Sequence, residues 1–304
     1  MEYREPVESY SGKVREMTIG KTGKALKIGG ENTLPFHTFE GSISNPPRLA
    51  LEVYDMEPKG WADWVLEPYK DVLSDPVKWA KKCVEKFGAE AICLQLVSTD
   101  PTEKDVSPEA AAALTRKVAD AVNVPLIVYG SGDEKKDVPV LTKVAEVCRG
   151  ENLLIGPATK ENYGGIGKAA LDNGHMVIAQ SPLDINLMKE LNIKLCKMLP
   201  AERIVIDPLS SALGYGMEYS FTIIERIKQT GVIFKDGMTQ MPVIANLGAE
   251  CWKTKQAKES KEQGLLWEGI TAMSLLLAGA NILVLRHPDN LRLIREIIQK
   301  GGVS

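Results

Sequence analysis

The chain has 304 residues, of which 44% are hydrophobic, and this length suits one β/α barrel of roughly 250 residues with an extension. Its formal net charge of −3 gives no reason to expect nucleic acid or an anionic membrane as a partner. The five cysteines are scattered and form no CxxC pair, so the sequence predicts neither a disulfide framework nor a cysteine-built zinc or iron–sulfur site.

Residues 1–45 differ from the rest of the chain and are predicted to form an N-terminal β-hairpin extension. The opening letters, MEYREPVESY, lack the apolar segment of a signal peptide, and we expect a cytoplasmic location. Polar and apolar residues alternate over Lys13–Ile19 and Lys24–Ile28, and Gly20–Gly23 joins these two runs, which is typical of a hairpin. Asn45-Pro46-Pro47 then interrupts regular structure before the first apolar run, so a barrel is predicted over residues 46–304.

Eight short apolar runs, separated by helix-like stretches, recur through the rest of the sequence. They are rich in Val, Ile and Leu and do not alternate with polar residues, as expected of parallel strands that are buried on both faces. Strand and helix alternating eight times predict an α/β fold, a (β/α)8 TIM barrel. The predicted strands are Leu49–Tyr54, Ala91–Val97, Pro125–Tyr129, Leu153–Ile155, His175–Ala179, Arg203–Asp207, Pro242–Asn246 and Ile282–Leu285.

The segments between these runs carry helix signals. Ser74-Asp75-Pro76 and Ser107-Pro108 each place a capping residue before a proline at the first helical position. The longest apolar stretch, Gly269–Leu285, is predicted to be a buried helix feeding a strand rather than a membrane span. Gly165–Ala170 matches GxGxxA, but the predicted strand before it ends near Ile155, too early for a dinucleotide-binding turn. A helix start or backbone packing is therefore favoured there.

Polar residues follow the predicted strands at their carboxyl ends, where this fold places its ligand sites. Most of them carry hydroxyl or amide groups or are glycines, and few are strong acids or bases. Such a surface favours binding of a large polar ligand over proton transfer, so no catalytic residue and no metal ligand is predicted. The predicted ligand-contact residues are Ser98, Thr99, Tyr129, Gly130, Ser131, Gln180, Asp207, Ser210, Ser211, Gly214, Asn246 and His287.

Two residue types leave alternatives open. His287 lies just past the eighth predicted strand, where it can contact a ligand or stabilise the loop, whereas His175 lies at the opposite end of the barrel and is expected to be packed or at the surface. An aldolase-like barrel would need a Schiff-base lysine near a strand end. The nearest lysine, Lys160, stands five residues beyond Ile155, which disfavours that activity.

Several motifs resemble those of one family. GGENTLPFH at Gly29–His37, followed by FEG at Phe39–Gly41, resembles the opening signature of the small subunit of the corrinoid/iron–sulfur protein, whose archaeal relative is the delta subunit of acetyl-CoA decarbonylase/synthase. The similarity covers essentially the whole chain, including the N-terminal hairpin. It continues through Asn45-Pro46-Pro47, Glu52–Asp55, Gly156–Thr159, Asp207–Leu209 and Gly214–Tyr219.

The resemblance implies a subunit of an anaerobic methyl carrier in the acetyl-CoA pathway of carbon dioxide fixation. The chain would form a heterodimer with a large subunit that carries a 4Fe-4S cluster and holds most of the cobamide, a B12-type corrinoid. The cobalt would take a methyl group from methyltetrahydrofolate on a separate methyltransferase and pass it to acetyl-CoA synthase, with a reductive activator as a further transient partner. The present chain would cover one corrin face at the mouth of its barrel, without making or breaking a bond.

The same resemblance leaves a second function open. The family's barrel is similar to those of pterin-dependent methyltransferases, which grip the pterin with aspartates after strands three and six and asparagines after strands four and seven. Asp207 and Asn246 match the later two positions, whereas Tyr129-Gly130 and Gly156-Pro157 stand at the earlier two. A methyltetrahydrofolate methyltransferase is therefore the alternative, with half of the pterin-binding set absent.

Overall fold

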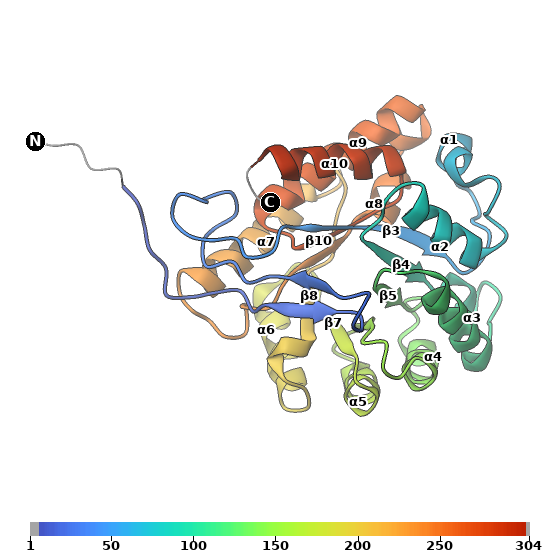
Figure 1. Ribbon diagram of the computed structural model, residues 1–304, viewed down its shortest axis with the longest axis horizontal. Coiled ribbons are helices and arrows are strands. Elements are labelled where there is room, and N and C mark those ends of the chain that lie inside the picture. The colour runs from blue at the N-terminus through green and yellow to red at the C-terminus, as the bar shows by residue number, and fades with distance from the viewer. Residues whose placement is uncertain (1–5, 302–304) are drawn as a thin grey trace, which may run out of the picture.

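The computed structural model describes residues 6–301, which form ten strands and their connecting helices (Figure 1). Strands β1 (Met17–Ile19) and β2 (Leu26–Ile28) pair as an antiparallel hairpin. The other eight strands are β3 (Arg48–Tyr54), β4 (Ala91–Gln95), β5 (Leu126–Tyr129), β6 (Leu154–Ala158), β7 (Met176–Gln180), β8 (Ile204–Asp207), β9 (Ile244–Asn246) and β10 (Ile282–Leu285). The helices are α1 (Asp63–Leu66), α2 (Pro76–Glu85), α3 (Pro108–Ala121), α4 (Glu134–Val147), α5 (Tyr163–Asn173), α6 (Ile185–Cys196), α7 (Met217–Val232), α8 (Gly248–Trp252), α9 (Lys261–Ala278) and α10 (Pro288–Lys300).

The eight longer strands close into a barrel. Their order is β8-β7-β6-β5-β4-β3-β10-β9, and every neighbouring pair is parallel. The ring is completed between β8 and the residues that lead into β9, where Ile206 bridges Val243 and its N–H donates to the carbonyl of Pro242 at 2.9 Å. The predicted TIM barrel with an N-terminal hairpin is confirmed.

The predicted helix starts at α2 and α3 are confirmed by their caps. Asp75 Oδ1 accepts the N–H groups of Val77 and Lys78, and Ser107 Oγ accepts that of Ala110. Each cap satisfies backbone donors that the first turn of a helix leaves free, and a proline follows at the first helical position. The helices are amphipathic and pack around the outside of the barrel (Figure 1).

The hairpin covers the end of the barrel where the strands begin. The Gly20 N–H donates to the carbonyl of Asn152 just before β6, and the Arg15 N–H donates to the carbonyl of Gln240 just before β9. Gly20 also approaches Pro125 so closely that a Cβ at residue 20 would lie 2.9 Å from the proline Cβ. The hairpin therefore leaves the opposite end, the mouth formed by the carboxyl ends of the strands, for other uses. The predicted division of the chain at residue 45 stays a prediction.

Strand β6 is longer than the sequence predicts. The apolar run Leu153–Ile155 predicts a strand that ends near Ile155, but β6 continues through Gly156-Pro157 to Ala158. The physical reason is packing: a Cβ on Gly156 would lie 2.6 Å from the Cβ of Ile178, so this glycine allows close approach to β7 and is not a turn residue. The GxGxxA motif lies within α5, and not in the turn between a strand and a helix that a dinucleotide-binding site needs.

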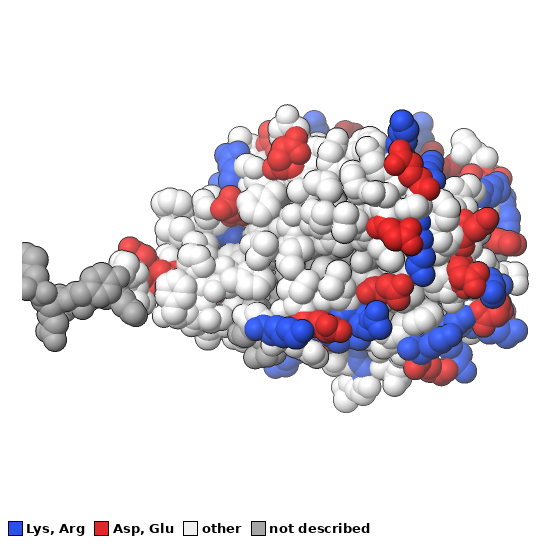
Figure 2. All heavy atoms as spheres, turned by 90° about the horizontal axis from the view of Figure 1, so that it is seen from above, with Lys and Arg blue, Asp and Glu red and all other residues white. Residues whose placement is uncertain are grey.

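Helix α9 is only half buried, which corrects the prediction of a buried helix for Gly269–Leu285. It does feed strand β10, but Leu266, Ile270 and Leu277 are 54%, 39% and 48% exposed. Figure 2 looks onto the side of the molecule that carries α9 and α10 and shows a broad area without charged side chains. Among the helices of residues 6–301, none has the length and apolar character that crossing a membrane requires.

Candidate functional site

A buried hydrogen-bonded network lies at the mouth of the barrel and joins three of the predicted ligand-contact residues. Asp207, at the end of β8, is 1% exposed. Its Oδ2 accepts the hydroxyl of Tyr129 at 3.0 Å, from the end of β5, and the amide Nε2 of Gln180 at 2.9 Å, from the end of β7. Burial raises the pKa of Asp207 above its ordinary value, although the bonds from Gln180, Leu209 and Tyr129 each lower it. The carboxylate is therefore held by the protein's own donors.

The same carboxylate fixes an unusual backbone conformation. Asp207 Oδ1 accepts the N–H of Leu209 at 2.9 Å, and Leu209 has a φ of 67°. This left-handed conformation is rare for a residue with a bulky side chain and is found where the surroundings enforce it. The result is an apolar side chain, 38% exposed, that projects at the mouth.

Two loops at the mouth are held by aspartates of their own. Ser98 donates its N–H and its hydroxyl to Asp55, which follows β3. Ser131 donates in the same way to Asp137 of α4, and a Cβ on Gly130 would lie 2.3 Å from the Asp137 carboxyl carbon. Burial is the largest cause that raises the pKa of both aspartates. Ser98, Gly130 and Ser131 thus shape the rim through internal contacts.

The remaining predicted residues lie at separate points of the rim. Thr99 is fully buried and donates to the carbonyl of Leu96, and Asn246 Oδ1 accepts the side-chain amide of Gln95 at 3.4 Å. Ser210 is 7% exposed, and its Oγ has no hydrogen-bond partner among the described residues. The Ser211 N–H donates to the hydroxyl of Ser220, and Gly214 has a φ of 75° that suits a turn.

The two histidines outside the N-terminal segment have structural roles. His287 caps α10, where its Nδ1 accepts the N–H of Asp289 at 3.2 Å, and burial lowers its pKa to about 4. A neutral imidazole in a cap supports the loop-stabilising alternative, while contact with a ligand stays a prediction. His175 is fully buried, with Nδ1 accepting from Leu153 and Nε2 facing the Ala145 carbonyl at 2.9 Å, which confirms a packed histidine.

One cluster at the mouth was not selected from the sequence. The Arg286 guanidinium, after β10, pairs with the buried carboxylate of Glu52, donates to the hydroxyl of Tyr54 at 2.9 Å and lies 3.8 Å from the ring centroid of Trp61. Arg286 is itself 4% exposed. A sequence signal existed, since Glu52 is a lone acid in an otherwise apolar strand and an interior charge needs a partner.

Below that cluster lies a second buried acid, Glu268 of α9. Its carboxylate accepts the N–H groups of Arg286 and His287 and the side-chain amide of Asn290. Burial raises the pKa of Glu268 to about 7. These contacts fix the turn from β10 into α10.

The rim is also lined by exposed aromatic side chains after β8. Tyr215 and Tyr219 are 52% and 64% exposed, and the Tyr215 hydroxyl donates to Gln256 at 3.0 Å. The position of the segment Ser210–Tyr219 after a barrel strand places these rings at the mouth. Exposed tyrosines with an apolar face and a polar tip are typical of surfaces that contact a ligand or partner.

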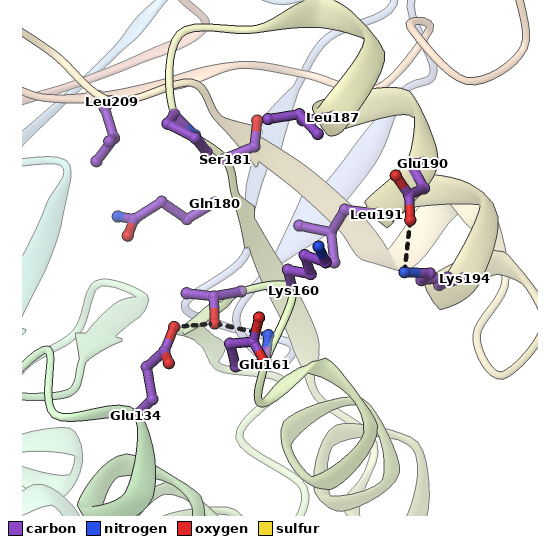
Figure 3. Close-up of a pocket in the computed structure, with 12 residues that line it drawn as sticks. Glu134, Lys160, Glu161, Gln180, Ser181, Leu187, Glu190, Leu191, Lys194 and Leu209 are labelled. Carbon is purple, nitrogen blue, oxygen red and sulfur yellow. Dashed lines mark hydrogen bonds and ion pairs between the residues drawn. The ribbon is translucent and has the colours of Figure 1, made fainter.

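A cavity of about 300 Å³ opens beside the Asp207 network, between the loop after β6, the loop after β7 and helix α6 (Figure 3). Leu187, Leu191 and Leu209 supply apolar walls, while Gln180 and Ser181 contribute polar groups. Ser181 is 5% exposed, and its Oγ has no hydrogen-bond partner among the described residues. Charged side chains surround these groups: Glu134, Lys160, Glu161, Glu190 and Lys194.

This arrangement offers binding groups but no arranged acid–base or nucleophile set. Lys160 is an exposed residue on the cavity rim, so its amine is not desolvated as a Schiff-base lysine would be. Across residues 6–301, no three or more His, Cys, Asp or Glu side chains lie together in a group able to hold a metal ion.

Comparison with known proteins gives a family-level match over nearly the whole chain. Residues 16–302 match the family described as CO dehydrogenase/acetyl-CoA synthase delta subunit. The chain is 35% identical to the acetyl-CoA decarbonylase/synthase complex subunit delta of Methanosarcina mazei, over 96% of this chain and 72% of that protein. It is 36% identical to the subunits of the same name from Methanothermobacter thermautotrophicus and Methanocaldococcus jannaschii, over 97% and 98% of this chain and 78% and 76% of those proteins.

Solved structures support the fold. Dihydropteroate synthase from Xanthomonas albilineans, with 4-aminobenzoic acid, superimposes with a TM-score of 0.63 at 14% identity, over 93% of this chain and 98% of that chain. The Yersinia pestis enzyme with a pterine–sulfa conjugate gives the same TM-score, identity and coverage. At this identity the similarity concerns the barrel alone.

Proposed function

This chain belongs to the CO dehydrogenase/acetyl-CoA synthase delta subunit family, and on that premise we propose that it is the non-catalytic small subunit of a corrinoid methyl carrier. In this role it covers one face of a cobamide at the mouth of its barrel. The cobamide is shared with a large subunit, which carries the 4Fe-4S cluster. Methyl groups then pass from a methyltetrahydrofolate methyltransferase to acetyl-CoA synthase, with a reductive activator as a transient partner and the cytoplasm as the location.

The observation that carries this proposal is the state of the Asp207 carboxylate. Three groups donate to it, with both oxygens occupied: the Tyr129 hydroxyl, the Gln180 amide and the Leu209 N–H. A residue whose hydrogen bonds are already made can shape a site but is poorly placed to exchange a proton with a substrate. The mouth is accordingly suited to holding and shielding a ligand.

The exposed groups at the mouth fit a large ligand with an apolar ring face and polar substituents. Leu209, Tyr215 and Tyr219 offer exposed apolar contact area, and the amide of Gln180 lies at the same rim. A cobamide supplies a methyl-accepting cobalt at the centre of such a ring when it is bound. The chain's own residues would contact the ring and its substituents and exclude water and competing ligands from that face.

The exposed surface of the chain, as well as its family, supports the presence of a partner subunit. The exposed apolar residues of α9, with Leu293 of α10 at 47% exposure, form a surface of the kind that proteins usually cover. The relatives are named as subunits of a complex.

The alternative function, a pterin-dependent methyltransferase, is favoured by one observation: Asp207 and Asn246 both lie at the strand ends that such enzymes use. Against it, both oxygens of Asp207 already accept hydrogen bonds, Oδ2 from Tyr129 and Gln180 and Oδ1 from the Leu209 N–H. Asn246 meanwhile accepts from Gln95.

The visible spectrum and cobalt content of the chain, purified alone and after co-expression with its candidate large subunit, test the two functions. Corrinoid absorbance only in a one-to-one complex is expected for the carrier subunit. Binding of methyltetrahydrofolate by the chain alone, with methylation of free cobalamin, would establish the methyltransferase and refute the carrier role.

A further inference from the structure

The cavity of about 300 Å³ beside the Asp207 network adjoins a second hollow of about 500 Å³. Glu134, Thr159 and Gln180 line both, so the two form one recess along the loops after β5, β6 and β7. We propose that this recess is a socket for an arginine side chain of the partner subunit. The inference rests on the proposed function and adds where, and by which chemistry, the partner is held.

The first argument is the charge around the recess. Five of the residues that line it are acids and three are lysines, which leaves an excess of negative charge. Lys194 is already paired with Glu190 at 2.7 Å, whereas Glu134 bonds to the neutral hydroxyl of Thr159 at 2.6 Å. The recess therefore favours a cation over an anion. The acids are Asp133, Glu134, Asp137, Glu161 and Glu190, and the lysines are Lys135, Lys160 and Lys194.

Two carboxylates beside the recess are buried and bonded to neutral donors. Asp137, 1% exposed, accepts the N–H groups of Ser131 and Gly132 and the Ser131 hydroxyl. Asp207, also 1% exposed, accepts the amide of Gln180, which itself lines the recess. Both oxygens of each carboxylate accept hydrogen bonds, which is the pattern of the ionised form. Buried charges are screened less than exposed ones, so they add to a negative potential in the recess.

The second argument is the apolar wall. Leu187, Leu191 and Leu209 line the recess on the side of α6 and of the loop after β8 (Figure 3). Leu209 is fixed there, with a φ of 67°, by its bond to Asp207. A long cationic side chain uses both kinds of surface, because its methylene stem packs on apolar groups while its charged tip stays with polar ones. A bare metal ion would gain nothing from the leucines.

The acceptors in the recess favour arginine over lysine. Glu134 and Glu161 supply carboxylates, and Gln180 supplies an amide oxygen, since its Nε2 is used on Asp207. A guanidinium presents five N–H donors in a rigid fork and is more weakly hydrated than an ammonium group. It can therefore pair with several acceptors at once and lose less on leaving water. The recess opens at the rim of the mouth, where the proposed partner lies.

The affinity of the chain for its candidate large subunit, measured by calorimetry with both purified subunits, tests the socket. Leu187→Trp fills the recess from a residue that is 42% exposed and should weaken the complex about tenfold. The double variant Glu134→Gln/Glu161→Gln removes two carboxylates that would meet the guanidinium. It should also weaken the complex about tenfold and make its affinity less dependent on salt.

Matched variants control for both changes. Ile193→Trp adds the same ring to α6 at a residue that is 47% exposed and does not line the recess. Glu146→Gln/Asp172→Asn removes two exposed acids from α4 and α5, away from the recess. Both controls should bind the large subunit like the wild type. All four variants change exposed side chains, so their unfolding midpoints should match that of the wild type and separate lost binding from lost folding.

A small cation tests the chemistry without the partner. Ethylguanidinium, added to the chain alone, should shift the methyl NMR signals of Leu187, Leu191 and Leu209. N-ethylurea has nearly the same shape and no charge, so it should shift them far less. In Leu187→Trp the signals of Leu191 and Leu209 should no longer respond, whereas in Ile193→Trp they should respond as in the wild type.

The possible results distinguish this inference from the function beneath it. If the large subunit binds the wild type and all variants equally and ethylguanidinium shifts no leucine signal, the socket is refuted and the carrier role stands. If Leu187→Trp weakens only cobalamin binding, or changes only the self-association of the chain, the occupant is the ligand or a second copy, and an arginine of the partner is refuted. If the two subunits form no complex, the proposed function fails and the socket fails with it.

Discussion

The two ends of this barrel are built in opposite ways. At the end where the strands begin, the hairpin satisfies backbone groups of the loops, and the buried Lys228 ammonium is matched by Glu31 at 2.8 Å and Asn281 at 2.6 Å. At the mouth, the hydroxyls of Ser181 and Ser210 have no hydrogen-bond partner within residues 6–301, and the buried Asp207 carboxylate accepts only from neutral donors. Large apolar side chains are exposed there as well.

The contrast shows where this fold separates stability from function. Charges at the hairpin end are paired with one another, so they hold the chain's first residues to the barrel. Burial alone would raise the pKa of Glu31, but Lys228 and the bond from Asn281 hold it below its ordinary value. At the mouth, burial raises the pKa of Asp207, because no cation opposes it. A buried carboxylate without a cation is therefore found at the mouth, whereas buried polar atoms without a partner among the described residues occur at both ends, such as Glu31 Oε2 and Ser210 Oγ.

The largest effect is expected at the hairpin end, for Lys228→Met. This change keeps the length of the side chain but leaves the Glu31 carboxylate buried without its cation, which should lower the free energy of unfolding by about 4 kcal/mol. Urea unfolding followed by circular dichroism measures it. Lys168→Met is the control, since the Lys168–Asp172 pair is solvent-exposed and should contribute almost nothing. Equal losses of stability in Lys228→Met and Lys168→Met would contradict the prediction that the buried ion pair stabilises the fold more than the exposed one.

The second prediction concerns pH and has opposite signs at the two ends. His287, with its pKa lowered to about 4, adds stability as the pH rises from 4 to 6.5. Glu268, with its pKa raised to about 7, binds its proton more tightly in the folded state, so its own contribution to stability should fall as the pH rises from 4.5 to 7. The shift corresponds to about 3 kcal/mol above that window. Glu31, with its pKa lowered, should instead lose its contribution as the pH falls below 4.5.

Unfolding of wild type and Glu268→Gln across pH 3 to 8 checks these signs. The difference in the free energy of unfolding should grow in favour of the variant from pH 4.5 to 7, because only the contribution of Glu268 is removed while those of His287, Asp55, Asp137 and Asp207 stay. Both proteins should keep the acid-side loss. A variant whose curve parallels the wild type throughout would show that Glu268 titrates normally.

A smaller effect is expected for Tyr129→Phe at the mouth. Removal of the hydroxyl takes one donor from the buried Asp207 carboxylate and should lower the free energy of unfolding by about 2 kcal/mol. The variant also tests the alternative function, because it removes one of the two donors to Asp207 Oδ2 and leaves only Gln180 there. Methyltetrahydrofolate binding that appears in Tyr129→Phe, measured by calorimetry, would mean that the tyrosine alone blocks a pterin site.

The barrel could be predicted from the sequence because its strands and helix starts are specified by short local patterns. Eight Val-, Ile- and Leu-rich runs and capping residues such as Asp75 specify strands and helix starts without knowledge of the rest of the chain. The end of β6 was wrong because Gly156 has two possible uses, a turn or a close approach, and only the position of Ile178 in the next strand decides between them. The exposed side of α9 was wrong because an apolar helix does not reveal which of its faces has a neighbour.

The location of the site could be predicted from the sequence, but the contacts among its residues could not. Position after a strand identified Tyr129, Gln180 and Asp207. The bond between Tyr129 and Asp207, however, joins β5 and β8, which are not neighbours in the barrel, and strand order does not give that distance. The hydrogen bonds from Ser131 to Asp137 could not be predicted from the sequence either, because they depend on where α4 begins. Ligand contact by the twelve predicted residues stays a prediction.

The smallest effect on stability is expected from two substitutions at opposite ends of one helix. They also give the sharpest test of the difference between the two ends of the barrel. Helix α7 has an exposed tyrosine at its mouth end, Tyr219, and an exposed phenylalanine just beyond its other end, Phe234, at 64% and 73% exposure. Tyr219→Ser and Phe234→Ser should both leave the unfolding midpoint nearly unchanged, since neither ring is buried in the chain. Only Tyr219→Ser should weaken cobamide binding by the complex, measured by visible absorbance, because only that ring lies where a ligand covers the mouth. Equal weakening by both would mean that the ligand or its carrier reaches the hairpin end, and the separation of stability from function along the barrel axis would not hold.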